Sequence, residues 1–263
     1  MDTKPVFHGS DIEKICSYYN LKKEDIVKFG ANVNPLGLSP RASQAIASHV
    51  ELLSSYPDRE YTSLRNTISR YCNIPADFIL PGNGSSELIS LLIQERSPKH
   101  TLILGPTYSE YSRELSFSGS TQEYYHLQES MDFEPDIPDL CRKLEQGYDF
   151  LILCNPNNPT SSAISKKDLR DLIHFCAEKD IFVMIDELKS ISTYKVYPAY
   201  ANFILLKIQK DGLTSYDVFE ACIKEGLMIR DCSSFQCLDG EFIRFCIMKP
   251  EDNNRLLKVL KTI

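Results

Sequence analysis

The sequence predicts an α/β fold, with a large domain built on a mostly parallel sheet and a small α+β domain at the carboxyl end. Short apolar segments alternate with helical segments between residues 100 and 186, which is the pattern of parallel strands joined by crossover helices. Two of these segments, 150–153 and 181–185, are continuous apolar runs of the kind found in buried parallel strands. The chain has 263 residues, enough for two domains.

Helical segments dominate the first hundred residues. An amphipathic pattern predicts a helix over 11–20, a second is expected from Pro40 to about Val50, and a third over 63–71. Pro40 suits the first turn of its helix, because its missing N–H would have no partner there. A fourth helix is predicted after Pro81-Gly82-Asn83-Gly84-Ser85-Ser86-Glu87, where apolar residues again follow helical spacing.

The alternation that defines the large domain follows from about residue 100. Its expected strands are 101–104, 121–127, 150–153 and 181–185, and its expected helices are 110–117, 136–146 and 166–179. After residue 187 the pattern changes to that of an α+β module. Its expected extended segments are 195–198, 201–208, 227–230 and 242–248, and its expected helices are 215–226 and 251–261.

Composition excludes several classes of function. The net charge is −7 without a basic cluster, so binding to nucleic acid or to an anionic membrane is not expected. No segment resembles a signal peptide or a membrane span. The nine cysteines include no CxxC pair and several fall in apolar patterns, so we expect reduced thiols in a cytoplasmic protein. The five histidines show no ligand spacing, and no metal site is expected.

Polar residues follow two neighbouring strands of the predicted sheet. Asn155 begins the rigid turn Asn155-Pro156-Asn157-Asn158-Pro159-Thr160, and Asp186 closes the run 181–185. The carboxyl ends of parallel strands are where α/β proteins bind ligands. An amide there can hydrogen-bond the ring hydroxyl of a pyridine cofactor, and a carboxylate can hold the ring nitrogen protonated. A buried aspartate is costly unless it meets a cation, and a protonated pyridine is one.

Two further motifs suit the same kind of ligand. Gly84-Ser85-Ser86 precedes a predicted helix, so its amides can bind a phosphate at the helix amino terminus; simple helix capping is the alternative interpretation. Tyr108 follows the strand 101–104 in Gly105-Pro106-Thr107-Tyr108. It can stack on a flat ring, although packing is the commoner role of such a tyrosine.

With these motifs the chain resembles the fold-type-I pyridoxal-phosphate enzymes of the class I/II aminotransferase superfamily. Within it, the chain is similar to the branch that contains histidinol-phosphate aminotransferase and threonine-phosphate decarboxylase. The resemblance implies a three-layer large domain and pyridoxal 5′-phosphate as cofactor. It places Gly84, Ser85 and Ser86 at the cofactor phosphate. It also places Tyr108 on the ring, Asn155 at the ring oxygen and Asp186 at the ring nitrogen.

The resemblance also implies substrate and partner contacts. Arg244, in Phe242-Ile243-Arg244-Phe245, matches an arginine that binds the substrate α-carboxylate, for which a guanidinium fork is suited. A surface charge on a strand is the other interpretation of Arg244. His8 and Asn32 lie in matching amino-terminal stretches and are expected at the substrate. Tyr61 matches a tyrosine that reaches the cofactor phosphate of a neighbouring subunit, which implies a homodimer.

Details within the branch favour the decarboxylase. The stretch Phe29–Gly37 and the segment Ile229–Phe235 resemble that enzyme more than the aminotransferase. The resemblance then implies decarboxylation of a phosphorylated amino acid, L-threonine O-3-phosphate, in cobalamin biosynthesis. Histidinol-phosphate aminotransferase, which acts in histidine biosynthesis, is the alternative. A truncated homologue that binds the cofactor or a metabolite without catalysis is the second alternative.

The lysine that carries the cofactor as a Schiff base has no convincing match. The resemblance implies an amino-terminal arm and helix over 1–50, a large cofactor-binding domain over 51–187 and a small domain over 188–263. The family has some tens of further residues, including that lysine, where Glu187 here meets Leu188.

Lys189 is a poor substitute, because it follows Asp186 too closely to be placed independently over the reacting carbon. The large domain is therefore expected to be incomplete and the chain as written inactive. Either a mobile segment has been left out and the numbering closed over it, or the protein is truly shortened.

Overall fold

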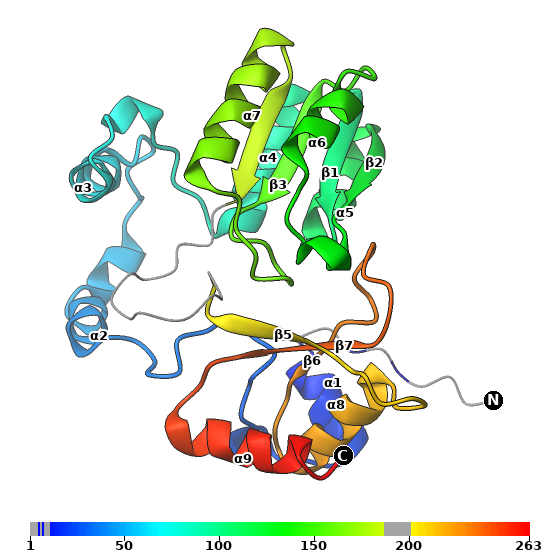
Figure 1. Ribbon diagram of the computed structural model, residues 1–263. Coiled ribbons are helices and arrows are strands. Elements are labelled where there is room, and N and C mark those ends of the chain that lie inside the picture. Colours follow the sequence, from blue (N-terminus) through cyan, green and yellow to red (C-terminus); the bar gives the residue numbers. More distant parts are fainter. Residues whose placement is uncertain (1–4, 6, 8–10, 187–200) are drawn as a thin grey trace. The chain divides into compact units, whose positions relative to one another are not determined.

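The computed structural model describes residues 5, 7, 11–186 and 201–263 (Figure 1). The chain divides into two compact units, one formed by residues 1–33 with 98–263 and the other by residues 34–97. The predicted domains 1–50, 51–187 and 188–263 rest on the family resemblance and stay a prediction. Within the described residues, no helix is both long and apolar enough to cross a membrane.

A four-stranded parallel sheet forms the first part of the larger unit. Its strands are β1 (His100–Gly105), β2 (Thr121–His126), β3 (Phe150–Cys154) and β4 (Phe182–Asp186), in the order β2-β1-β3-β4. All three pairings are parallel. The structure therefore confirms the four strands and the parallel sheet expected from the alternating pattern.

The strand register brings the expected polar residues to one edge of the sheet. Cys154 of β3 lies opposite Asp186 of β4, and the backbone N–H of Asn155 donates to the Asp186 carbonyl at 2.9 Å. Asn155 and Asp186 are thus neighbours at the carboxyl ends of adjacent strands, as the sequence predicts. This edge is the usual ligand site of α/β sheets.

Helices α6 (Ile137–Leu144) and α7 (Lys166–Glu178) cover one face of this sheet, where they lie side by side (Figure 1). Alternate residues of β1 and β3 point toward them. The buried cluster on this face includes Leu102, Leu104, Leu151, Leu153, Leu140, Leu144, Leu172 and Cys176. Ile103 and Ile152 alternate to the other face and are also fully buried. Helix α5 (Glu110–Ser118) joins β1 to β2 and packs against β2.

A charged cluster stands at the opposite, amino-terminal edge of the sheet. The Glu123 carboxylate accepts hydrogen bonds from Lys143 Nζ at 3.0 Å and Tyr148 Oη at 2.8 Å. It also lies 3.1 Å from His100 Nε2, and the His100 ring stacks on Tyr148 with centroids 4.1 Å apart. The hydrogen bond from Lys143, followed by those from Tyr148 and His100, lowers the pKa of Glu123 to about 2.

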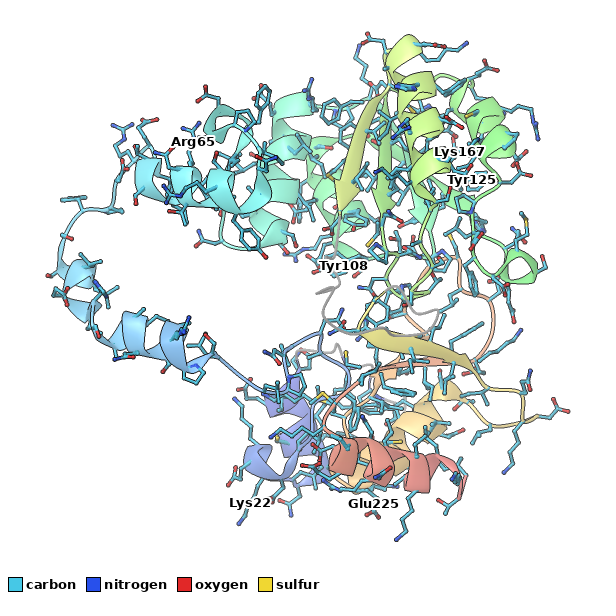
Figure 2. The ribbon with its side chains drawn as sticks, turned by 60° about the vertical axis from the view of Figure 1, so that its left-hand side comes forward. Lys22, Arg65, Tyr108, Tyr125, Lys167 and Glu225 are labelled. Carbon is cyan, nitrogen blue, oxygen red and sulfur yellow. The ribbon has the colours of Figure 1, made fainter. Side chains whose placement is uncertain are left out.

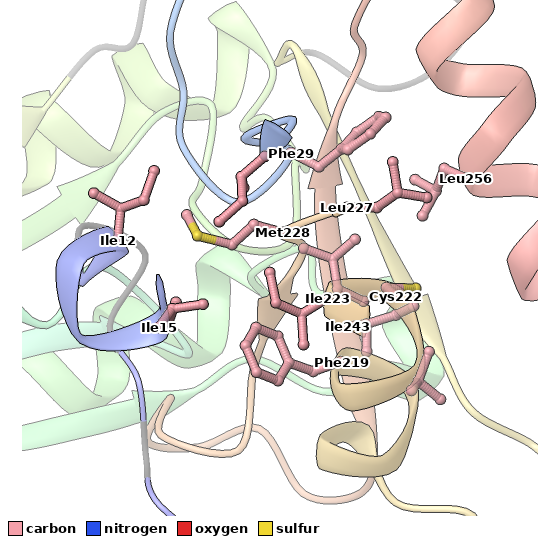
Figure 3. Packing of buried hydrophobic residues seen from close by; sticks show 13 residues of the cluster. Ile12, Ile15, Phe29, Phe219, Cys222, Ile223, Leu227, Met228, Ile243 and Leu256 are labelled. Atoms are coloured by element: carbon pink, nitrogen blue, oxygen red, sulfur yellow. The ribbon is translucent and has the colours of Figure 1, made fainter. Parts of the chain in front are cut away.

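The small module contains an antiparallel sheet in the order β5-β7-β6, made of β5 (Phe203–Lys207), β6 (Arg230–Asp231) and β7 (Phe242–Cys246). Helices α1 (Ile12–Tyr19), α8 (Ser215–Lys224) and α9 (Pro250–Leu260) complete it. Its core joins residues of α1, α8, β7 and α9 with Phe29 and Met228 (Figure 3). The extended segment expected at 195–198 lies outside the described residues.

One predicted strand is shorter than expected. The apolar pattern extends over 227–230, but β6 contains only Arg230 and Asp231. The preceding residues pair instead with the amino-terminal segment, since Met228 N–H donates to Val27 O at 2.9 Å and Gly30 N–H donates to Met228 O at 2.6 Å. This pairing ties residues 27–30 to the small module.

The unit of residues 34–97 is mainly helical. It contains α2 (Pro40–Ala47), α3 (Thr62–Cys72) and α4 (Ser85–Arg96), with short 3-10 turns at Val50–Ser54 and Ala76–Phe78. Arg65 holds α3 to the second turn by donating to Ala76 O at 2.8 and 3.1 Å. Neither α2, α3 nor the two turns contains a buried residue. Large apolar side chains are therefore exposed, among them Leu53, Tyr56, Tyr71 and Phe78.

Replacing Glu123 with glutamine tests the cluster at the amino-terminal edge. A carboxyl whose pKa is lowered on folding stabilises the folded state above its unfolded pKa, and this stabilisation is lost as pH falls through the folded value. For Glu123 that window runs from the ordinary value of 4.5 down to about 2. We expect Glu123→Gln to melt below the wild type at pH 7, with the difference closing as pH falls through this window. The measurement is the melting temperature against pH. Glu178→Gln, at an exposed position of α7, should show no such closing, and a difference independent of pH for Glu123→Gln would contradict the assignment.

Candidate active site

Asp186 at the end of β4 is held by a tyrosine that the sequence did not single out. Tyr111, from α5, donates its hydroxyl to Asp186 Oδ2 at 2.7 Å. Its side chain is fully buried, and this burial raises the pKa of the phenol well above its ordinary value, so Tyr111 is a neutral donor. Its ring also meets Tyr108 edge to face, with centroids 5.6 Å apart and an angle of 85°. Tyr108 lies below the carboxyl ends of the strands (Figure 2).

The side-chain oxygen of Asn155 accepts a hydrogen bond from a residue that follows its turn. Its Oδ1 accepts from the Ile164 N–H at 2.9 Å. This bond orients the amide and leaves its NH₂ group as the part able to donate to a ligand. The predicted contact with a ring oxygen is compatible with this geometry and stays a prediction.

Asn157 connects the two loops that carry Tyr108 and Asn155. It is buried, and its Nδ2 donates to Pro106 O at 2.9 Å and to Thr160 Oγ1 at 2.8 Å. Its Oδ1 accepts from Thr107 Oγ1 at 3.1 Å. Both loops are therefore fixed to one another at the edge of the sheet, which explains why the turn is so rich in asparagine.

Ser161, after the turn, has a left-handed backbone with φ of +63°. A residue with a side chain rarely adopts this conformation, which suits glycine. Ser161 is buried, and its Oγ accepts from the Ala201 N–H at 3.2 Å.

Arg244 of β7 is buried, with 6% of its surface exposed, so the interpretation as a surface charge is wrong. Its Nη1 donates to Asn158 Oδ1 at 2.5 Å and its Nη2 to Gly30 O at 2.8 Å. The guanidinium lies 4.8 Å from the Phe203 ring centroid. Its Nε is buried without a hydrogen-bond partner among the described residues. A buried donor left unsatisfied is costly and marks a place for a missing acceptor.

Arg230 is a second buried arginine, to which no sequence motif points. It lies directly opposite Arg244 in the β6–β7 register. Its side chain donates to Phe7 O and to Ser234 Oγ, each at 3.1 Å. Burial lowers the pKa of both guanidinium groups, yet both stay charged at neutral pH because an arginine starts so high.

In the described part of the chain, no carboxylate forms an ion pair with either arginine. Asp231 and Asp11 act on Arg230 electrostatically, and two adjacent buried cations still favour an anion as ligand. An arginine inside an apolar strand pattern is the signal that could have revealed Arg230.

The expected phosphate-binding residues belong to the unit 34–97. Gly84 has φ of +83° and precedes α4, whose first residues are Ser85 and Ser86. No side chain caps this helix, and the Glu87 carboxylate accepts instead from the Asn83 N–H and, at 3.2 Å, from Asn83 Nδ2. Within this unit the first-turn amides are thus available to a ligand. Tyr61 is half exposed at the start of α3.

Of the remaining predicted residues, the structure describes Asn32 only. Asn32 is exposed, and its Oδ1 accepts from the Cys246 thiol at 2.9 Å. This contact fixes Asn32 to β7, two residues beyond Arg244. His8 and Lys189 lie outside the described residues.

Comparison with known proteins decides the family. The model of the family "Aminotransferase class I and II" matches residues 24–188, more than half of the chain. The chain belongs to this family. Class I and II aminotransferases depend on pyridoxal 5′-phosphate, so the predicted cofactor is confirmed for the family. The resemblance stated from the motifs is confirmed as well.

Relatives in the family carry both of the expected activities. Histidinol-phosphate aminotransferase of Methanococcus aeolicus is 24% identical, with 97% of this chain and 94% of that protein covered. Threonine-phosphate decarboxylase of Salmonella typhimurium is 29% identical, with 97% and 96% covered. Both alignments span nearly the whole of each protein.

Solved structures show the same fold. Histidinol-phosphate aminotransferase from Clostridium acetobutylicum matches with a TM-score of 0.77 at 21% identity, covering 89% of this chain and 98% of that one. L-threonine-O-3-phosphate decarboxylase from Porphyromonas gingivalis matches with a TM-score of 0.73 at 17% identity, covering 89% and 98%. The aminotransferase from Sinorhizobium meliloti, solved in complex with pyridoxal-5′-phosphate, has a TM-score of 0.77 at 13% identity and covers 99% and 96%.

The alignments also show how much shorter this chain is. The alignment with the M. aeolicus protein has 351 positions, which exceeds the 263 residues of this chain by 88. At least that many positions of the relative therefore have no counterpart here. The printed sequence passes directly from Glu187 to Leu188, where the additional segment was expected.

Asn157→Ala tests the connection between the two loops. The substitution removes three hydrogen bonds, two of them buried, and leaves Pro106 O and Thr107 Oγ1 without their partner. We expect the free energy of unfolding to fall by about 2–4 kcal/mol, measured by urea denaturation. Asn254→Ala, at an exposed position of α9, should change it by less than about 0.5 kcal/mol. Equal effects of the two substitutions would show that Asn157 does not hold the loops together.

Proposed function

We propose that this chain binds pyridoxal 5′-phosphate and L-threonine O-3-phosphate, as a protein of the threonine-phosphate decarboxylase type. Family membership supports the cofactor, and the buried pair of arginines supports a substrate with two anionic groups. The unsatisfied Nε of Arg244 is the observation that carries the proposal, because it is a buried, positively charged donor in need of an acceptor.

The residues at the carboxyl edge of the sheet fit the cofactor. Asp186 offers a carboxylate for the ring nitrogen, Tyr108 an aromatic face for the ring, and the Asn155 NH₂ a donor for the ring oxygen. We propose that the first-turn amides of Ser85 and Ser86 bind the phosphate, together with Gly84. When bound, a protonated pyridine supplies an electron sink for a carbanion.

The arginines fit the substrate. Arg244 is oriented by Asn158 and Gly30, so its fork is fixed before a ligand arrives. We propose that it binds the α-carboxylate and orients the bond to be broken, with Asn32 and His8 near the same substrate. Arg230 is then placed to bind the second anionic group, the phosphate. Prearranged charge of this kind costs no reorganisation during the reaction.

Two other functions share much of this arrangement. Histidinol-phosphate aminotransferase uses the same cofactor and is the commoner activity among the named relatives. The decarboxylase is favoured because threonine phosphate carries a carboxylate and a phosphate in one molecule, which suits two adjacent arginines.

A non-catalytic homologue is favoured by the 88 or more absent positions, since the lysine expected in that segment has no convincing match. We propose that the chain by itself binds both ligands without efficient turnover.

A homodimer is part of the proposal. The unit 34–97 exposes large apolar side chains, with Leu53 at 87% and Tyr56 at 100% exposure. Exposed apolar side chains gathered in one unit are typical of interaction sites, and Tyr61 lies in the same unit, where the family resemblance expects an intersubunit contact. A cytoplasmic location is also proposed, supported by nine cysteines that are all free thiols.

Product analysis with borohydride reduction tests the function. We expect the chain with pyridoxal phosphate to release little or no CO₂ from L-threonine O-3-phosphate, and mass spectrometry after borohydride to find no lysine modified stoichiometrically by the cofactor. Equilibrium dialysis should still detect binding of the cofactor. Rapid CO₂ release with one modified lysine would show that the chain is active as written, and glutamate-dependent amino transfer would assign the aminotransferase instead.

Sedimentation tests the homodimer. We expect the wild type to sediment as a dimer at micromolar concentration and Leu53→Asp to dissociate toward the monomer, because a charge would be buried at the interface. Phe117→Asp is the control, since Phe117 is similarly exposed (74%) but lies in α5 of the other unit. A monomeric wild type would contradict the proposal, and dissociation by both substitutions would place the interface elsewhere.

A further inference from the structure

We propose that Tyr111 is a positioning residue that sets the orientation of the Asp186 carboxylate toward a cofactor ring. The inference rests on the proposed function for the cofactor, but the contact between the two residues does not. Tyr111 was not expected from any motif, and its sequence separation from Asp186 is 75 residues.

The hydrogen bond from Tyr111 fixes one of the two oxygens of the Asp186 carboxylate. Tyr111 Oη lies 2.7 Å from Oδ2 and is the one side-chain or backbone donor to this carboxylate seen in the described residues. The Cys154 thiol donates to Pro156 O at 3.3 Å and also contacts the Tyr111 hydroxyl. With Oδ2 held, Oδ1 is the oxygen left to receive a proton from a ring nitrogen. Tyr111 itself cannot turn away readily, because its side chain has no exposed surface.

The donor is present at every working pH. Burial raises the pKa of the Tyr111 phenol and keeps it protonated, so its hydroxyl donates to Asp186 Oδ2 throughout the working pH range. With Oδ2 fixed, the direction of Oδ1 is fixed as well. Loss of the hydroxyl frees the carboxylate to turn, and its contact with a ring nitrogen is then weakened.

The Tyr111 side chain also packs against the residue that is proposed to stack on the cofactor ring. Tyr111 packs edge to face on Tyr108, the residue proposed to stack on the ring. One buried side chain therefore contacts both the proposed ring stack and the proposed partner of the ring nitrogen. Replacing Tyr111 with phenylalanine keeps the ring contact with Tyr108 and removes only the hydroxyl, so the two contributions can be separated.

A double-mutant cycle in the cofactor-free protein tests the contact. The variants are Tyr111→Phe, Asp186→Asn and the double variant, and urea denaturation measures their stabilities. We expect the two substitutions to be non-additive, with the double variant less destabilised than the sum of the single variants. The matched control is Tyr148→Phe, which removes a similar tyrosine–carboxylate bond at Glu123 and should be additive with Asp186→Asn. Additivity for Tyr111→Phe would overturn the proposal.

The second measurement uses ¹⁵N-labelled pyridoxal 5′-phosphate and does not depend on turnover. In Tyr111→Phe we expect the ring ¹⁵N resonance to move toward that of a neutral pyridine and the dissociation constant to rise about ten- to a hundredfold. Tyr148→Phe should match the wild type in both. An unchanged resonance in Tyr111→Phe would overturn the positioning role even if the cycle shows coupling. If the wild type itself binds no cofactor, the proposed function fails and the positioning role fails with it, while the cycle still decides the contact.

Discussion

The buried guanidinium of Arg244 is the contact on which the rest of the proposed site depends. One of its nitrogens donates to Asn158 in the turn after β3, and another donates to Gly30 in the amino-terminal segment. Three segments that are far apart in sequence are therefore joined at a single cation. A charge buried this deeply is costly unless its donors are satisfied, and its Nε is not satisfied by any described residue. We propose that an anion of the substrate satisfies it.

The carboxyl edge of the parallel sheet supplies the other half of the arrangement. Strands β3 and β4 end in register, so Asn155 and Asp186 lie side by side. Asn157 fixes the loop after β1 to the turn after β3 through buried hydrogen bonds. The same turn thus carries Asn155 toward Asp186 and Asn158 toward Arg244. Each asparagine of this turn therefore has its own contact within the protein, whichever substrate binds.

Much of this arrangement could be predicted from sequence, because its signals are local. Apolar runs predicted β3 and β4, and the polar residue after each run predicted the edge where Asn155 and Asp186 lie. Arg244 could be found only through a family motif, since a strand arginine is as often exposed.

The contacts of Tyr111 and Asn157 could not be predicted, because each depends on partners 50 or more residues away. Periodicity indicates that Tyr111 faces inward, but it does not say which polar group its hydroxyl meets. The apolar pattern around Arg230 predicts packing and does not reveal a buried charge.

Binding of L-threonine O-3-phosphate to the wild type and to Arg244→Gln, in the presence of pyridoxal 5′-phosphate, tests the central claim most directly. Calorimetry measures both dissociation constants without requiring turnover. Removing one partner of a buried charged contact costs about 2–5 kcal/mol, so we expect the dissociation constant to rise by roughly thirtyfold or more. Equal affinities for the two proteins would contradict the account, because Arg244 would then not be the residue that receives the substrate anion.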